Sequence, residues 1–282
     1  MGSINQDGTD GSSGVFYFYD RTTGELKFRD GATLQTTRGV VMNGATLDMV
    51  FDGGRFEIIE HNTVRDSVST WTENRGAGFK TTGAGLDLAI CEGTAHAFNF
   101  PIYGDGKVVK TGEGTFKLVA ARAEGEKLIQ YTGGTVVSNG TLVIDGSLVA
   151  DGAKSFEVAE GAILDLNETT LAGATISGSG VVTNGTLSAA TIAYDEDALP
   201  TFSDVAFSGT LFVDFGKSAD DPLDKTAAKA GIVVAHYTGE APVNLRVKSV
   251  NTGIERARTA VVCEGGDVIA KMTQSGFSVI IR

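Results

Sequence analysis

The stretch KTGEGTFKLVAARAEGEKLIQYTGGTVVSNGTLVIDG, from Lys110 to Gly146, is the most informative part of this 282-residue chain. Apolar and polar residues alternate in its runs Thr115–Val119 and Thr141–Ile144, and a third run extends from Tyr131 to Val137. Strict alternation is typical of a strand with one buried and one solvated face. A glycine precedes each of the first two runs and indicates a bend that a side chain would obstruct. We therefore interpret the stretch as one turn of a winding sheet.

The same module, a glycine followed within two residues by apolar alternation, recurs along the chain. It begins at Gly31, Gly44, Gly54, Gly83, Gly114, Gly140, Gly161, Gly173, Gly185 and Gly209. Two modules make a coil of roughly 20 to 24 residues, which is a typical length for a solenoid repeat. Asn-Gly pairs at Asn43, Asn139 and Asn184 predict corners, because both residue types tolerate a positive φ.

An antiparallel sandwich is the main alternative, since Asn-Gly is also a strong hairpin signal. Hairpins would place two strands symmetrically around each Asn-Gly pair. Here a one-sided Gly-Thr-Leu enters each strand in the same register, as at Gly140 and Gly185. This asymmetry favours parallel winding.

The stretch also resembles a known family. Its pattern of Lys-x-Gly-x-Gly-Thr, then Tyr131-Thr-Gly-Gly-Thr135, then Asn139-Gly-Thr-Leu142, is similar to the autotransporter-associated β-strand repeat of bacterial surface proteins. The Ser-Gly-x-Asn that usually precedes the tyrosine is absent and is replaced by residues 122–130. The resemblance implies an all-β fold, a right-handed parallel β-helix located outside the cytoplasm. It implies no catalytic site, because the repeat is a scaffold.

Composition agrees with a fold of many short strands. The chain contains 38 glycines but only four prolines, without the strict triplet of collagen. Its net charge of -12 disfavours nucleic acid and anionic membranes as partners, because both are negatively charged. No apolar run is long enough for a membrane span, and no secretion signal is visible at the N-terminus.

We expect three regions. Residues 1–14 form a flexible lead or tag, residues 15–192 the parallel β-helix, and residues 193–282 a β-rich C-terminal cap continuous with it. The cap includes the predicted helix Asp220–Ala230 and several short strands. The distant positions of Cys91 and Cys263 predict two free, buried thiols, because a linear solenoid would separate them by far more than the roughly 7 Å that a disulfide spans.

Candidate functional residues lie in one polar segment. His61 and Arg65 combine a base and a cation in the loop after Ile59, which a lyase-like site would require. Trp71, the only tryptophan, could stack on a sugar ring or anchor a partner. An ordinary polar loop and a satellite hydrophobic cluster, respectively, are the simpler interpretations.

No cofactor is predicted. The three histidines have no metal-ligand spacing. Asn5, Asp7 and Asp10 of the lead resemble a calcium loop only weakly, because the closing glutamate is missing. The leading functional hypothesis is therefore a non-catalytic stalk, adhesin or fibre component that is secreted or displayed on a cell surface. A polysaccharide-processing enzyme or glycan-binding module on the same scaffold is one alternative. A self-polymerising filament subunit is another.

Overall fold

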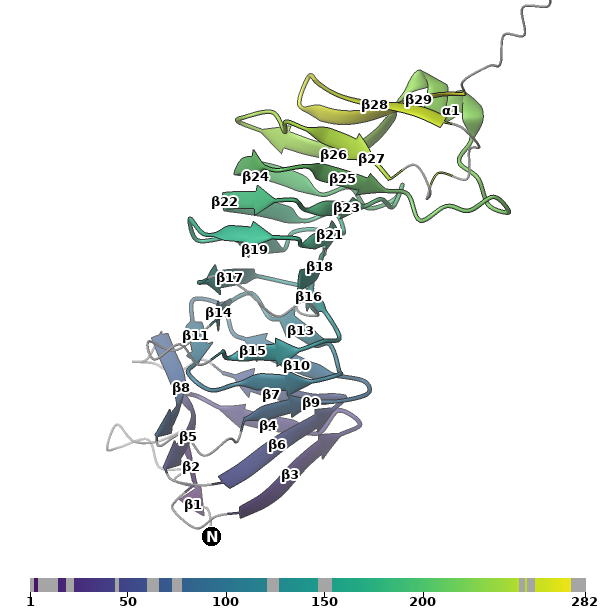
Figure 1. The fold of residues 1–282 in the computed structure, drawn as a ribbon. Coiled ribbons are helices and arrows are strands. Elements are labelled where there is room, and N and C mark those ends of the chain that lie inside the picture. Colours follow the sequence, from purple (N-terminus) through teal and green to yellow (C-terminus); the bar gives the residue numbers. More distant parts are fainter. Residues whose placement is uncertain are drawn as a thin grey trace, which may run out of the picture.

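The protein is all-β, with one short helix in the part of the chain that the structure describes (Figure 1). A computed structural model describes residues 3–4, 15–18, 23–43, 46–59, 66–72, 78–120, 127–146, 154–248, 252 and 257–274. Figure 1 shows the strands stacked above one another from the purple N-terminal end to the yellow C-terminal end.

The described strands form three sheets. The long sheet contains β1 (Ser3–Ile4), β2 (Val15–Phe18), β5 (Gly39–Asn43), β8 (Asp66–Thr72), β11 (Ala95–Phe98), β14 (Thr115–Val119), β17 (Thr141–Asp145), β19 (Ile163–Asp165), β20 (Thr170–Ala172), β22 (Val181–Ser188), β24 (Thr201–Ser208), β26 (Ile232–Thr238), β29 (Asp267–Gln274) and β28 (Ala257–Glu264). The second sheet contains β4 (Thr33–Thr36), β7 (Gly54–Ile58), β10 (Leu86–Ile90), β13 (Val108–Thr111), β16 (Thr135–Val137), β18 (Ser155–Val158), β21 (Thr175–Ser177), β23 (Thr191–Ala193), β25 (Leu211–Asp214) and β27 (Leu245–Val247). The short sheet contains β3 (Thr23–Arg29), β6 (Thr46–Asp52), β9 (Phe79–Thr81), β12 (Ile102–Gly104) and β15 (Ile129–Tyr131).

Successive strands enter these sheets in rotation. From β3 to β17 the chain visits the short, second and long sheets in turn, so that each strand from β3 to β14 pairs with the strand three places later. From β18 to β27 it alternates between the second and long sheets, apart from the extra strand β20 beside β22. The described pairs are parallel, apart from β1 with β2 and the C-terminal pairs β26 with β29 and β28 with β29. The parallel pairing predicted from the one-sided Gly-Thr-Leu module is confirmed.

The stretch from Lys110 to Gly146 contains one full rotation. Strand β14 lies beside β17, with Thr115 next to Thr141. The predicted single run Tyr131–Val137 is wrong, because it comprises the end of β15 and the whole of β16, which belong to different sheets. Gly134 adopts a positive φ of 81° between them and turns the chain through a corner.

The length of one rotation varies with the loops that interrupt it. Gln35 of β4 lies beside Glu57 of β7, 22 residues later, as the repeat predicts. Arg55 of β7 lies beside Asp87 of β10, 32 residues later, because the chain between them includes the longer segment around β8. Insertions therefore lengthen individual rotations without disturbing the register of the sheets.

One continuous apolar core runs through the stack, from Phe28 to Met272. Its N-terminal half contains a ladder of aromatic rings, in which Phe51 lies 4.9 Å from both Phe28 and Phe79, measured between ring centroids. Alternation places these rings on the inner face, while the intervening side chains are more exposed. The periodic sequence pattern therefore becomes a column of stacked side chains.

The C-terminal end differs from the rest of the stack. Helix α1 (Lys225–Ala230) is shorter than the predicted helix because Asp224 caps it, accepting hydrogen bonds from the backbone N–H groups of Thr226 and Ala227. The helix packs against β29, whose antiparallel pairing with β26 and β28 ends the long sheet. Parallel pairing continues past residue 192 as far as β27.

Two smaller predictions concern the lead and the cysteines. Ser3 and Ile4 of the lead pair antiparallel with β2, whereas residues 5–14 lie outside the described residues. Cys91 and Cys263 are free, as predicted, but both are partly rather than fully buried. Burial raises the pKa of the Cys263 thiol.

Candidate functional site: a pocket beneath the C-terminal cap

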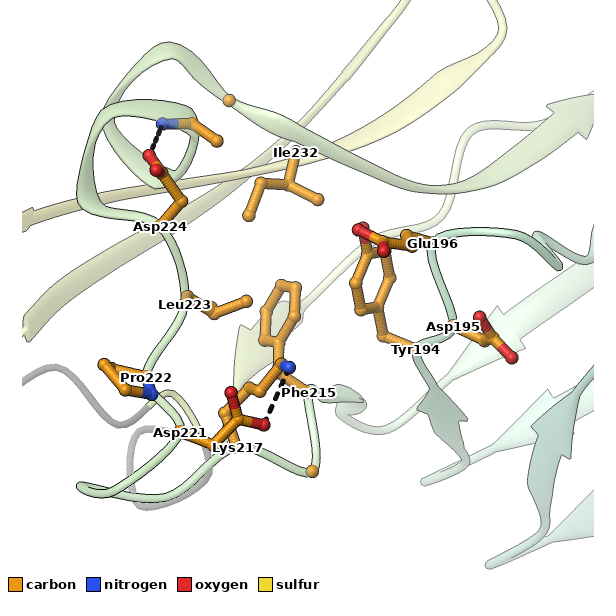
Figure 2. A pocket seen from close by; sticks show the side chains of 13 residues that line it. Tyr194, Asp195, Glu196, Phe215, Lys217, Asp221, Pro222, Leu223, Asp224 and Ile232 are labelled. Atoms are coloured by element: carbon orange, nitrogen blue, oxygen red, sulfur yellow. Dashed lines mark hydrogen bonds and ion pairs between the residues drawn. The ribbon is translucent and has the colours of Figure 1, made fainter.

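A pocket of about 580 Å³ lies where the sheets meet the C-terminal cap. Three segments enclose it: the turn after β23, the loop after β25, and helix α1 with the start of β26. Figure 2 shows Tyr194, Phe215, Leu223 and Ile232 around a common space, whereas Asp195 points away from it and Asp224 points to the backbone of α1. The pocket therefore depends on parts of the chain that are far apart in sequence.

Aromatic and aliphatic side chains form its floor. The rings of Tyr194 and Phe215 lie 4.8 Å apart between centroids and are tilted by 55°. Phe215 and Leu223 are buried, while Ile232 is partly exposed and faces them in Figure 2. Their burial anchors the pocket to the core, so that the floor is pre-formed.

Carboxylates surround this floor. Glu196 and Asp195 stand on the turn after β23, and Asp221 and Asp224 on the opposite side. Lys217 Nζ lies 2.9 Å from Asp221 Oδ2 and neutralises one of the four charges. Asp224 caps helix α1, so the remaining negative charge of the pocket comes mainly from Glu196 and Asp195.

The carboxylates also affect the titration of the Tyr194 phenol in the pocket floor. Burial raises the pKa of Tyr194, and the nearby carboxylates Glu196, Asp195 and Asp197 raise it further. The phenol therefore stays protonated at neutral pH and can donate a hydrogen bond into the pocket. The hydrogen bond with Asp221 raises the pKa of Lys217, so its ammonium stays charged.

The arrangement suits binding of a small polar ring. Aromatic faces pack against the C–H face of a sugar, and carboxylates accept hydrogen bonds from its hydroxyl groups. Binding pockets commonly combine an apolar floor with a few polar groups in this way.

The predicted site residues lie elsewhere or outside the described chain. Trp71 is in β8, where its backbone lies beside Met42 of β5, and Figure 1 shows strand β8 far from α1. His61 and Arg65 lie outside the described residues, as do the side chain of Trp71 and the calcium-like lead residues. The structure therefore leaves that candidate site untested.

Sequence reasoning missed the pocket, although part of its signal was visible. The acidic turn Tyr194–Pro200 stands out in the sequence, and helix α1 was predicted close by. Neither feature indicates that Phe215 and Ile232 would lie next to Tyr194. Only the return of the chain to the same end of the stack brings them together.

Ser69 and His96 have the atomic contact of a nucleophile and its base, but both are buried. Ser69 Oγ lies 3.0 Å from His96 Nε2 and accepts a hydrogen bond from the Val40 N–H. His96 is 1% exposed, and burial lowers its pKa to about 3. A substrate has no access to this pair, so its role is structural.

Lys110 is a second buried titratable group in the scaffold. Its Nζ donates hydrogen bonds to the backbone carbonyls of Thr111, Gly112 and Asn139. Burial lowers the pKa of Lys110 to about 8. The ammonium joins the corner after β13 to the corresponding corner of the next rotation, which explains the lysine that opens the repeat pattern.

Within the described residues, no group of three or more His, Cys, Asp or Glu side chains is arranged to hold a metal ion. That part of the chain also contains no helix with the length and apolar character needed to cross a membrane. No protein-family model matches the chain, and no significant match exists among curated proteins or solved structures.

Proposed function

We propose that the chain is a right-handed parallel β-helix that serves as a structural or adhesive segment, a stalk, adhesin or fibre component, outside the cytoplasm. The continuous apolar core from Phe28 to Met272, with successive strands entering the parallel sheets in turn around it, is the observation that carries this proposal. Stacked coils of this kind build a rod, since each coil buries its apolar side against its neighbours.

The outer faces support the same function. Arg55 bridges Asp87 and Glu57 at N–O distances of 2.6 and 2.9 Å, and Gln35 extends this polar ladder to the preceding strand. The net charge of -12 keeps such a surface hydrated. The resemblance to the autotransporter-associated repeat and this acidic surface both support extracellular display.

The rod can be tested by small-angle scattering combined with limited proteolysis of the full chain. We expect the distance distribution of an elongated particle and slow cleavage within the described strands, because their backbone groups are paired. A compact distance distribution, or rapid cleavage inside the strands from β9 to β25, would contradict the proposal.

Glycan binding is the second candidate, favoured by the cap pocket. A glycan array should then show a signal that Tyr194→Leu and Glu196→Gln both reduce, because one removes an aromatic face and the other a charged acceptor. Glu157→Gln, at an exposed position of β18, is the matched control. Binding that is lost in Trp71→Ala instead would place recognition at β8, and no binding at all favours the purely structural function.

A polysaccharide-processing activity is less well supported. The described basic groups whose pKa values are strongly lowered, His96 and Lys110, are buried in the scaffold and do not line the pocket. Incubation with acidic and neutral polysaccharides, followed by reducing-end and unsaturated-product assays, tests for hydrolase and lyase activity. We expect no products.

A further inference from the structure

Strand β3 is an open edge of the short sheet. It pairs with β6 on one side, and no described strand lies on its other side. Figure 1 shows β3 as the outermost strand of this sheet, at the N-terminal end of the stack. Such an edge presents unpaired backbone groups that can pair with another strand.

The direction of these backbone groups follows from the neighbouring strand. The Met49 N–H donates to the Gly78 carbonyl on the β9 side, so the backbone of Val50 faces β3. Val50 lies beside Lys27 in the parallel register. Its backbone N–H and C=O groups therefore form hydrogen bonds with the residues on either side of Lys27. The backbone N–H and C=O groups of Glu25 and Lys27 consequently point to the open edge.

An apolar side chain is also left uncovered there. Leu26 lies beside Met49, which is fully buried, and so belongs to the inner column. Leu26 is nevertheless 39% exposed. The apolar column thus reaches the end of the short sheet without a covering residue among the described strands.

The charges around Leu26 are self-complementary. Glu25 and Lys27 flank it on the outer face, and their side chains form an ion pair of 2.8 Å within the strand. We propose that β3 pairs antiparallel with β3 of a second copy about a two-fold axis at Leu26. Glu25 of each copy then lies opposite Lys27 of the other, in pairs joined by backbone hydrogen bonds, and the two Leu26 side chains cover each other.

Other registers of the same pair are disfavoured. A shift of two residues in one direction places Glu25 opposite Glu25 of the second copy, and the opposite shift places Lys27 opposite Lys27. Like charges directly opposite each other destabilise a strand pair. A shift of one residue would put outer-face side chains against inner-face ones. The charge pattern therefore selects the register centred on Leu26.

Two-fold pairing has a consequence for assembly. The contact uses the same strand on both molecules and is closed, so it gives a dimer of two stacks joined end to end and does not propagate. It differs in this respect from a head-to-tail filament. The inference concerns only the sheet edge and does not depend on where the protein is displayed.

Sedimentation equilibrium of the full chain tests the pairing through charge exchange. The wild type should dimerise reversibly. Glu25→Lys alone places the introduced lysine opposite Lys27 of the second copy, and Lys27→Glu alone places two glutamates opposite each other. Each single variant should therefore weaken dimerisation about tenfold or more. The double variant E25K/K27E restores opposite charges and should dimerise like the wild type.

Mixing the two single variants gives the sharpest result. Each is self-repelling, but the two lysines in β3 of the E25K copy face the two glutamates in β3 of the K27E copy, so the mixture should form heterodimers. Glu157→Lys, at an exposed position of β18, is the matched charge control and should leave dimerisation unchanged. Circular dichroism verifies that every variant is folded. A monomeric wild type, single variants that dimerise normally, or a mixture that stays monomeric would each overturn the proposal.

Discussion

At the scale of single residues, two titratable side chains are held inside the scaffold by different means. Lys110 keeps its charge by donating to three carbonyl groups, whereas His96 packs against the rings of Phe56 and Phe98 and stays neutral. Both belong to the stack itself and stabilise neighbouring rotations. Burial lowers the pKa of both groups, so each makes the folded state more stable as the pH rises between its folded and its ordinary pKa.

His96 should make the protein sensitive to acid. Its pKa is lowered from 6.5 to about 3 by burial, so between these values the unfolded chain binds a proton that the folded protein does not. The free energy of unfolding therefore falls below pH 6.5, by roughly 2 kcal/mol at pH 5 from this group alone. Urea unfolding of the wild type and His96→Gln between about pH 7.5 and 4.5 measures this contribution. Identical pH dependence in the two proteins would contradict it.

Lys110→Met should destabilise the folded state by about 3 kcal/mol. The substitution preserves much of the side-chain volume but leaves three buried or partly buried carbonyls without their charged donor. Lys117→Met on the neighbouring strand β14 is the control, because Lys117 is exposed, and its effect should stay within about 0.5 kcal/mol. Equal effects of the two substitutions in urea unfolding would show that the carbonyl contacts contribute nothing.

At the scale of the element, the corners before strands set the direction of each strand. Gly140 precedes β17 and Gly161 precedes β19, and both have positive φ, of 64° and 78°. Their surroundings differ. A Cβ at Gly140 would lie 2.5 Å from the carbonyl oxygens of Gly112 and Gly114, whereas a Cβ at Gly161 has no atom within 4 Å.

Alanine substitutions at Gly140 and Gly161 distinguish the effect of backbone strain from the effect of steric contact with the neighbouring rotation. Gly161→Ala should lower the free energy of unfolding by about 1 kcal/mol, because alanine disfavours a positive φ. Gly140→Ala should cost at least about 3 kcal/mol, because the methyl group also collides with the preceding corner. Urea unfolding at neutral pH compares the two variants. Equal losses of unfolding free energy would mean that the corner at Gly140 can move away from the preceding corner almost freely.

At the scale of the whole molecule, each rotation contacts mainly its neighbours. Phe79 lies in the aromatic ladder near the N-terminal end, within 5 Å of Phe51, Phe98 and Phe100 between ring centroids. Phe202 is equally buried in β24, near the C-terminal cap. In a linear stack, damage at one position should be felt locally.

Hydrogen exchange of the variants Phe79→Ala and Phe202→Ala tests this locality. Each substitution creates a cavity and should lower the local free energy of unfolding by about 3 to 5 kcal/mol. Phe79→Ala should speed exchange in β6, β9 and β12 while leaving β26 and β29 unchanged, and Phe202→Ala should do the reverse. Uniformly faster exchange across all strands would instead indicate one globally cooperative unit.

Alternation and glycine placement made much of the secondary structure predictable. The strands Thr115–Val119 and Thr141–Asp145 follow from period-two patterns, which are local properties of the chain. The corner at Gly134 was missed because the run from Tyr131 to Val137 was interpreted as a single strand, although two adjacent glycines interrupt it. Periodicity does not reveal which sheet a residue enters, and the corner between β15 and β16 is only three residues long.

Local patterns along the chain were therefore enough to predict an all-β protein with parallel strand pairing and a short helix, because side-chain alternation, positive-φ glycines and helix caps act over a few residues. Three features became visible only in the folded molecule: the pocket shared by Tyr194, Phe215 and Ile232, the reach of Lys110 to the corner of the next rotation, and the uncovered Leu26 at the edge strand β3. These features depend on how many residues each rotation takes. Loops of unequal length set that number, and no local pattern encodes it.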